Sequence, residues 1–312
     1  MKRQRIYLLL FPALLLVSGC SDSEQSEPEQ VPIELHAQGD ATVETKADAD
    51  QAITKAFGTT VFASMRSGDY TGLTSPANVK EWKIDTEVQT NGTVPLSENP
   101  TYPENGDWLY LIAVAPKASS YSDNDGKVTY TLAGQTDLMY ASQISGNRWD
   151  GNHFVPLTYK HLLTQLTFKA MKKVTGGLTV KVKKITVTTT NSVTLALTDG
   201  ETSFSGSGEL FLELPDDGTE ISGTTATSLS NSLLLPPLTG TSDVYKLTVE
   251  TSIGTFKDLE ITPQSDGENL SFAGGTSHEI TLNIGDKELG ISSVTVSGWV
   301  PVIQNDDLNL VE

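Results

Sequence analysis

Apolar residues return at every second position through much of this chain, and that period limits what it can fold into. Side chains alternate between two faces in a β-strand, whereas an α-helix needs apolar residues three and four positions apart. Threonine and serine fill many intervening positions, which suits a pleated, half-exposed surface. We therefore expect an all-β fold, with at most short helices near Ser75–Glu81 and Asp137–Ser145. The clearest alternating sets are Leu178, Val180 and Val182; Tyr245, Leu247 and Val249; Ile280, Leu282 and Ile284; and Val294 and Val296.

Two further segments predict particular kinds of strand. Residues 108–114 form a continuous apolar run, typical of a strand buried on both faces, so we expect Trp108 to be buried. Residues 128–132 alternate directly after Asn124-Asp125-Gly126, a sequence typical of a tight hairpin turn.

The first twenty residues predict a secretory signal that ends at a lipidated cysteine. A basic start at Lys2, Arg3 and Arg5 precedes an apolar run over residues 6–17 and two small residues before Cys20. The run is shorter than the roughly 20 residues of a membrane-spanning helix. The four residues ending at Cys20 fit the lipobox of bacterial lipoproteins, in which the cysteine carries diacylglycerol. Its acyl chains would anchor the exported protein, because each buried methylene contributes about 0.8 kcal/mol. The alternative is an ordinary signal peptide with an incidental cysteine.

Cysteine usage and charge exclude several classes of function. Cys20 is the only cysteine, so the chain has no disulfide and no thiolate site. The formal net charge of -18 becomes -21 once the three basic signal residues are removed. So acidic a chain is repelled by phosphate backbones and anionic membrane surfaces, so we expect neither as a partner and no nucleic acid.

The region after Cys20 predicts a tether followed by a strand. Residues 21–30 are acidic and lack apolar side chains, as in a solvated linker. Ile33, Leu35 and Ala37 then share one parity, which predicts a strand within Val31–Glu44.

Length predicts two domains in the rest of the chain. About 290 residues follow the signal, which suits two domains of ordinary size. Polar, proline-containing sequence at 152–159 suggests a boundary near residue 160. We expect a signal peptide at 1–20, a tether and strand at 21–55, and two tandem β-sandwiches at 56–159 and 160–312.

Residues that carry catalysis or bind metal are not grouped in recognisable motifs. His36, His153, His161 and His278 show no metal-ligand spacing, and His161 opens an apolar run, where a packing role is expected. Residues 123–126 resemble the start of a calcium loop, but the closing glutamate is absent. We therefore predict no catalytic residue, no cofactor and no metal site.

Tryptophan offers a second class of function. A surface lipoprotein that binds glycans would present one or more exposed aromatic rings to a polysaccharide. The candidates are Trp82, Trp108, Trp149 and Trp299.

Four features together resemble the fimbrillins of Bacteroidetes type V pili, in order along nearly the whole chain. They are the lipobox cysteine with its acidic tether, the sequence Lys55-Ala56-Phe57-Gly58, the run His161–Phe168, and Leu233–Pro237 followed by Val294–Trp299. The resemblance implies two transthyretin-like, Greek-key sandwiches. It also implies an adhesive fimbrial subunit, exported to the outer membrane as a lipoprotein, cut by a trypsin-like protease and polymerised with other fimbrial subunits by donor-strand exchange.

The same resemblance assigns roles to particular residues. It places the cut between Lys55 and Ala56. The best-known processing in the family follows arginine, whereas residue 55 is a lysine. Two other basic residues, Lys46 and Arg66, therefore stay open as rival cut sites. The cut would discard the strand candidate and change the net charge from -21 to -14, since nine acidic and two basic residues leave. A subunit that is never cut would be an anchor subunit, and a tip subunit is a further alternative.

The resemblance also implies a donor strand at about residues 300–312. Its alternating apolar residues are Val300 and Val302, and then Leu308 and Leu310. The alternative is a C-terminal strand that completes its own sheet.

Overall fold

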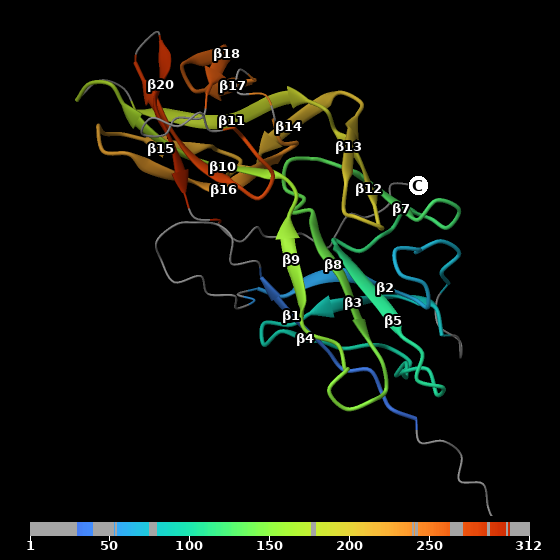
Figure 1. Ribbon diagram of the computed structural model, residues 1–312. Coiled ribbons are helices and arrows are strands. Elements are labelled where there is room, and N and C mark those ends of the chain that lie inside the picture. Colours follow the sequence, from blue (N-terminus) through green and yellow to red (C-terminus); the bar gives the residue numbers. More distant parts are fainter. Residues whose placement is uncertain are drawn as a thin grey trace, which may run out of the picture.

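The computed structural model describes residues 30–39, 53, 55–74, 80–175, 179–238, 240, 243–262, 271–285, 288–297 and 299 (Figure 1). These residues form twenty strands and no helix, which confirms the predicted all-β class. Accordingly, this part of the chain has no helix long and apolar enough to cross a membrane.

The largest sheet lies in the N-terminal half and has the order β3-β2-β5-β8-β9-β1-β4. Its strands are β1 (Leu35–Gly39), β2 (Phe57–Ser64), β3 (Trp82–Val88), β4 (Thr93–Val94), β5 (Leu109–Ala115), β8 (Met139–Gly146) and β9 (Leu157–His161). The strands β3 and β4 stand at opposite ends of this order, yet only a short turn separates them along the chain. Within it, the Gln89 N–H donates to the Thr93 carbonyl at 3.0 Å. The sheet therefore curls until its two ends meet.

The two faces of the curled sheet bury different side chains. Residues of even and odd number point to opposite faces of a strand, so Val61 faces inward and Phe62 outward. The inward side chains form what we call the inner cluster. Its largest members are Ile33, Leu35, Val61, Trp82, Ile84, Val88, Val94, Tyr102, Leu109, Leu111, Met139, Leu157 and Tyr159.

A second sheet covers the outward face and is built from distant parts of the chain. Its order is β13-β12-β7-β6, with β6 (Tyr121–Ser122), β7 (Lys127–Thr131), β12 (Ser192–Ala196) and β13 (Thr202–Ser205). The predicted turn at 124–126 is confirmed, since β6 and β7 form a hairpin in which Gly126 has φ 60°. The hairpin of β12 and β13 comes from beyond residue 160 and pairs with β7, with Leu195 opposite Val128. The chain thus crosses between its two halves.

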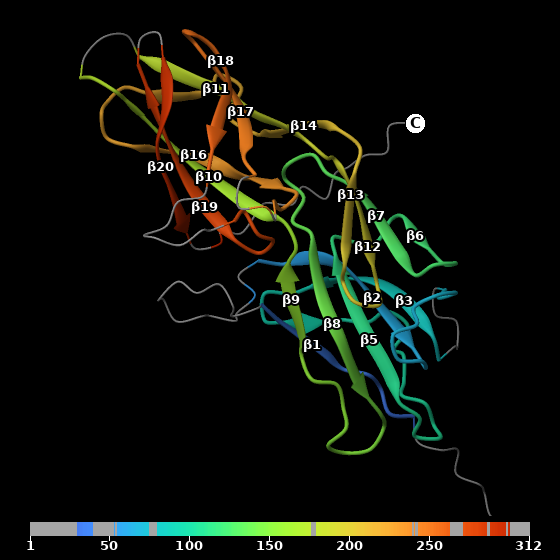
Figure 2. The same ribbon diagram turned by 45° about the horizontal axis from the view of Figure 1, so that its top comes forward.

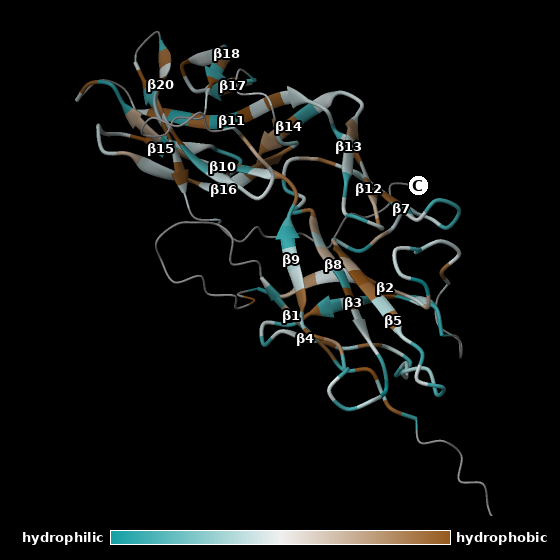
Figure 3. Ribbon diagram, in the orientation of Figure 1, coloured by the Kyte–Doolittle hydropathy of each residue, from teal (hydrophilic) through white to brown (hydrophobic). Residues whose placement is uncertain are grey.

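The C-terminal half is a sandwich of two sheets (Figures 1 and 2). One has the order β16-β10-β19-β20, and the other β14-β11-β17-β18 with β15 paired to β11. The strands are β10 (Thr164–Lys172), β11 (Val180–Thr189), β14 (Gly208–Leu212), β15 (Thr219–Ile221), β16 (Thr227–Leu235), β17 (Tyr245–Thr251), β18 (Gly254–Ile261), β19 (Ser277–Ile284) and β20 (Leu289–Ser297). Apolar side chains between these sheets continue into the outward face of the N-terminal sheet as one core. Figure 3 shows the apolar residues along the strands.

Two sequence expectations are wrong. The short helix near Asp137–Ser145 is instead strand β8. Trp108, expected to be buried, lies just before β5 and is 43% exposed. Of the other expected helix near Ser75–Glu81, only Lys80 and Glu81 are described, and they form a bend before β3.

His278 is a buried histidine in the middle of the C-terminal sandwich. It is 1% exposed, and its ring meets that of Phe272 edge-on at 4.7 Å. Its Nε2 lies 3.0 Å from Thr276 Oγ1, whereas Nδ1 has no hydrogen-bond partner among the described residues. Burial disfavours the charged ring and lowers the pKa of His278 to about 4.

Replacing Leu195 should destabilise both halves together. Leu195 is fully buried where the crossing hairpin meets the N-terminal half, so Leu195→Ala should lower the free energy of unfolding by about 2–5 kcal/mol. Thr194→Ala, on the opposite face of β12, should change it by about 0.5 kcal/mol or less. Calorimetry checks this expectation. A variant in which only one of two separate transitions moves would contradict the shared core.

His278 should make the fold sensitive to acid. The folded protein protonates this ring at about pH 4 and the unfolded chain at about pH 6.5, so the unfolded state binds more protons between these values. Stability should therefore fall as pH drops from 6.5 towards 4. In His278→Leu this part of the loss should vanish, whereas exposed His153→Leu should leave it unchanged. Urea unfolding at several pH values measures both, and equal acid slopes in all three proteins would refute the assignment.

Candidate assembly site

Strand β1 is inserted between two strands that come much later in the chain. Ala37, Gln38 and Gly39 pair in parallel with residues 157–159 of β9, and Leu35 and His36 pair antiparallel with β4. Both edges of β1 are therefore hydrogen-bonded, and β1 completes the curled sheet (Figure 1). This confirms the strand expected within Val31–Glu44 for the residues described there, 31–39.

The side chains of this segment alternate between the inner cluster and solvent. Ile33, Leu35 and Ala37 are 6%, 3% and 8% exposed, while Glu34 and His36 are exposed. Burying one large aliphatic side chain contributes about 1.5–3 kcal/mol. The segment is thus held by apolar contacts as well as by its backbone.

The residues just before β1 are also bonded to the body of the protein. The Ile33 N–H donates to the Pro100 carbonyl at 2.9 Å, and the Tyr102 N–H donates to the Val31 carbonyl at 3.0 Å. Further along, the Ala37 N–H donates to the Gly92 carbonyl at 2.7 Å. The bonded segment therefore spans residues 31–39, longer than β1 itself.

Side chains beside the position of β1 are fixed by contacts with other strands of the same sheet. Tyr159 on β9 is 2% exposed and meets Phe57 edge-on at 5.1 Å. The Thr59 hydroxyl donates its one proton to the Val114 carbonyl at 2.7 Å. The Tyr159 hydroxyl, 2.8 Å from Thr59 Oγ1, is therefore the donor in the bond between these two side chains. Burial raises the pKa of Tyr159, which keeps this hydroxyl protonated. We call the position between β9 and β4 the β1 slot.

The expected cut lies in the connection between β1 and β2. Lys55 and Ala56 are half-buried and directly precede β2, which begins at Phe57. The rival cut site Lys46 lies outside the described residues. The expected lipidation site, Cys20, lies outside them as well.

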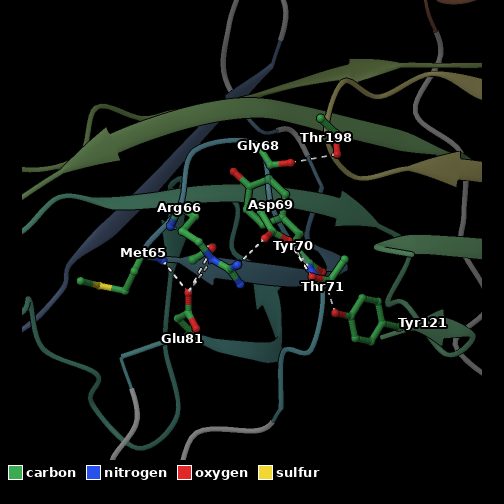
Figure 4. A network of polar contacts seen from close by, with 10 residues as sticks. Met65, Arg66, Gly68, Asp69, Tyr70, Thr71, Glu81, Tyr121 and Thr198 are labelled. Atoms are coloured by element: carbon green, nitrogen blue, oxygen red, sulfur yellow. Dashed lines mark hydrogen bonds and ion pairs between the residues drawn. The ribbon is translucent and has the colours of Figure 1, made fainter. Parts of the chain in front are cut away.

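Arg66, the other rival, lies in a loop held by many polar contacts (Figure 4). Its guanidinium is 2.9 Å from Asp69, and Thr71 donates to the same carboxylate from its hydroxyl at 2.6 Å and its N–H at 3.1 Å. These Thr71 bonds, more than Arg66, lower the pKa of Asp69. Thr198 of the crossing hairpin donates to the Gly68 carbonyl at 3.0 Å. Residues 58–64 of β2 are all buried. A cut after Arg66 would break the covalent link between this buried strand and the rest of the protein.

The segment before the C-terminal tail is fixed where the two halves meet. The ring of Trp299 stacks on that of His161, at the end of β9, with centroids 3.8 Å apart. His161 Nδ1 is 2.8 Å from Asp137 Oδ1, so this histidine has the packing role expected for it. The predicted donor residues Val300, Val302, Leu308 and Leu310 lie outside the described residues.

Sequence reasoning did not identify the residues that receive β1. Leu157 and Tyr159 do alternate, but nothing local signals that they pair with residues 37–39. Tyr102 was likewise missed, although it is 3% exposed and bonded to Val31. Nowhere in the described part of the chain do three or more histidine, cysteine or acidic side chains gather as a metal would require.

These features define a class of all-β protein in which a separately attached N-terminal strand completes a sheet. The sequence matches the family described as fimbrillin-like over residues 41–299, so the chain belongs to that family. This confirms the resemblance found in the sequence. Members are structural proteins of the cell surface, so the chain is a fimbrial protein and not an enzyme.

Solved structures share the fold at low sequence identity. A putative cell adhesion protein from Bacteroides uniformis has a TM-score of 0.56 at 15% identity, covering 86% of this chain and 98% of its own. One from Bacteroides ovatus has a TM-score of 0.57 at 14% identity, covering 89% and 100%. A protein from Bacteroides thetaiotaomicron, titled a putative polysaccharide binding protein, has a TM-score of 0.52 at 14% identity, covering 88% and 99%. Comparison with the curated proteins gives no match.

Loosening β1 should expose its hydrogen bonds to exchange. Leu35→Ala removes a side chain that is 3% exposed in the inner cluster, so local opening of β1 should become easier by about 2–5 kcal/mol. The Ala37 and Tyr102 amides should then exchange at least about tenfold faster in hydrogen-exchange mass spectrometry or NMR. Glu34→Ala, on the exposed side, is the matched control. Unchanged exchange in Leu35→Ala would mean that the backbone bonds alone hold the strand.

Proposed function

We propose that this chain is the precursor of a fimbrial subunit, anchored to the outer membrane through lipid on Cys20 and activated by proteolysis after Lys55. Cleavage frees residues 21–55, β1 leaves its slot, and a C-terminal strand from another subunit fills it. The product is a fimbrium that supports adhesion.

The observation that carries this proposal is the insertion of β1 between β9 and β4. Of the described strands, only β1 precedes Lys55, so one cut there separates it from the others. The curled sheet would then keep two unpaired edges and lose Ile33, Leu35 and Ala37 from its inner cluster. Such an edge binds an extended segment whose apolar residues alternate.

Cleavage matters because it changes how β1 competes for the slot. While the chain is intact, β1 is tethered next to the slot at an effective concentration in the mM range, which a separate strand in dilute solution does not reach. After the cut β1 stays with the lipid on Cys20 and is no longer joined to the rest of the subunit, so it loses this local concentration once it dissociates. A strand with similar apolar spacing then replaces it at little net cost in free energy.

The C-terminal tail suits the role of donor. Val300 and Val302, and then Leu308 and Leu310, repeat the spacing of Ile33, Leu35 and Ala37. The stacked Trp299 and His161 fix the point from which the tail departs.

Other outcomes of processing remain within this scheme. A cut after Lys46 would also free β1, leaving a longer N-terminus on the mature subunit. A chain that is never cut keeps β1 and its lipid, as expected of an anchor subunit.

Blocking the cut should block assembly. A trypsin-like protease should trim the lipid-free precursor to Ala56 and yield ladders that survive mild denaturant, while Lys55→Gln should stay intact and monomeric. Arg66→Gln is the matched control and should be processed normally. N-terminal sequencing and native gels give the readout.

The donor role is tested separately. A chain lacking residues 300–312 should be trimmed at Ala56 yet form no ladder. If trimmed full-length protein stays monomeric, or if the deletion leaves the ladders unchanged, strand exchange through this tail is refuted. Trimming that persists in Lys55→Gln would move the cut to another residue.

A further inference from the structure

Two exposed tryptophans lie on neighbouring loops at one end of the N-terminal half. Trp108 is 43% exposed and Trp149 is 57% exposed, the highest values of the four tryptophans. Trp108 directly precedes β5 and Trp149 follows β8 closely, and the strand ends Leu109 and Gly146 are register partners. The two loops, 103–108 and 147–154, therefore leave the sheet side by side. In Figures 1 and 2 the loop after β8 lies at the opposite end of the molecule from the C-terminal sheets.

The loops hold Trp149 in place although most of its surface is open. The backbone N–H of Trp149 donates to Asn147 Oδ1 at 3.0 Å, and the backbone carbonyl of Trp149 accepts from the Asn152 N–H at 3.0 Å. The Arg148 guanidinium lies 5.4 Å from its ring and donates to the Glu104 carbonyl of the other loop. The indole also lies against Gly106, where an added Cβ would come within 2.6 Å of Nε1. A rigid aromatic side chain that stays exposed presents a binding surface at low entropic cost.

The groups around the two indoles favour a sugar over a protein. Asn105, Asp107 and Asp150 are exposed on the same loops and offer amides and carboxylates that hydrogen-bond hydroxyl groups. An indole face packs against the C–H groups of a pyranose ring through dispersion and weak C–H contacts. Protein interfaces, by contrast, are depleted in aspartate and glutamate at their centres.

Charge narrows the class of sugar. The chain carries a net charge of -18, and on the two loops Glu104, Asp107 and Asp150 outnumber Arg148, so glycans bearing uronate, sialate or sulfate groups are repelled. We propose that Trp108 and Trp149 form a binding site for neutral, pyranose-containing glycans. This site is separate from the β1 slot and does not depend on processing.

Affinity electrophoresis of the mature chain tests the site. Native gels containing mannan, β-glucan or galactan should retard the wild-type protein in at least one case, and gels containing polygalacturonate should not. Trp108→Ala and Trp149→Ala should each weaken retardation about tenfold, and the double variant should migrate as in a gel without polysaccharide. Gly106→Ala keeps both indoles but displaces Trp149, and it should weaken binding as well.

Ile253→Ala, at an exposed apolar residue of the C-terminal half, is the matched control and should bind normally. Equal thermal melting of all variants separates lost binding from lost folding. The proposal is overturned if no neutral polysaccharide retards the wild type, or if the double variant is retarded equally. It is also overturned if the tryptophan variants instead lose only the ability to form ladders, because this end is then an interface between subunits.

Discussion

Every buried backbone N–H and C=O must find a hydrogen-bond partner. In the N-terminal sheet of this protein, β1 supplies those partners to β9 and β4, although it precedes both strands in the sequence. A strand on the outside of a sheet can leave its free edge to water. The slot between β9 and β4 is different, because the sheet curls around an apolar cluster and its two ends meet. The fold is therefore complete only when some strand occupies the slot, whichever chain supplies it.

The slot is also linked to the surface that carries the tryptophans. Tyr102 donates its N–H to Val31 at one end of the slot, and its hydroxyl accepts from the Phe154 N–H at 3.1 Å. Its ring stacks on both His153 and Phe154, with centroids 5.1 and 5.3 Å apart. The loop that positions Trp149 thus packs against the residue whose backbone N–H is bonded to the segment before β1. Tyr102 therefore lies between the slot and the tryptophan loops and is hydrogen-bonded to both.

The strands were largely predictable from local pattern, but their partners were not. Alternation identified β1, β7, β17 and β19 because in each of them polar residues alternate with apolar residues along the sequence. Strand β8 escaped because residues 137–141 are buried on both sides, which removes alternation, and a register shift against β5 disturbs the rest. The burial of Trp108 was misjudged because β5 begins one residue later, at Leu109. Parallel pairing of β1 with β9 joins residues about 120 positions apart, and no local signal encodes such a contact.

The crossing hairpin of β12 and β13 has a mechanical consequence. Figures 1 and 2 show it extending from the C-terminal half along the side of the N-terminal half, where it pairs with β7. Because β12 lies beyond residue 160 and β7 before it, their five residue pairs tie the two halves of the chain together. A force that slides one half past the other along these strands would load all five pairs in shear at once instead of parting them one at a time. Within each subunit of the proposed fibre, the junction between the halves would therefore resist such sliding.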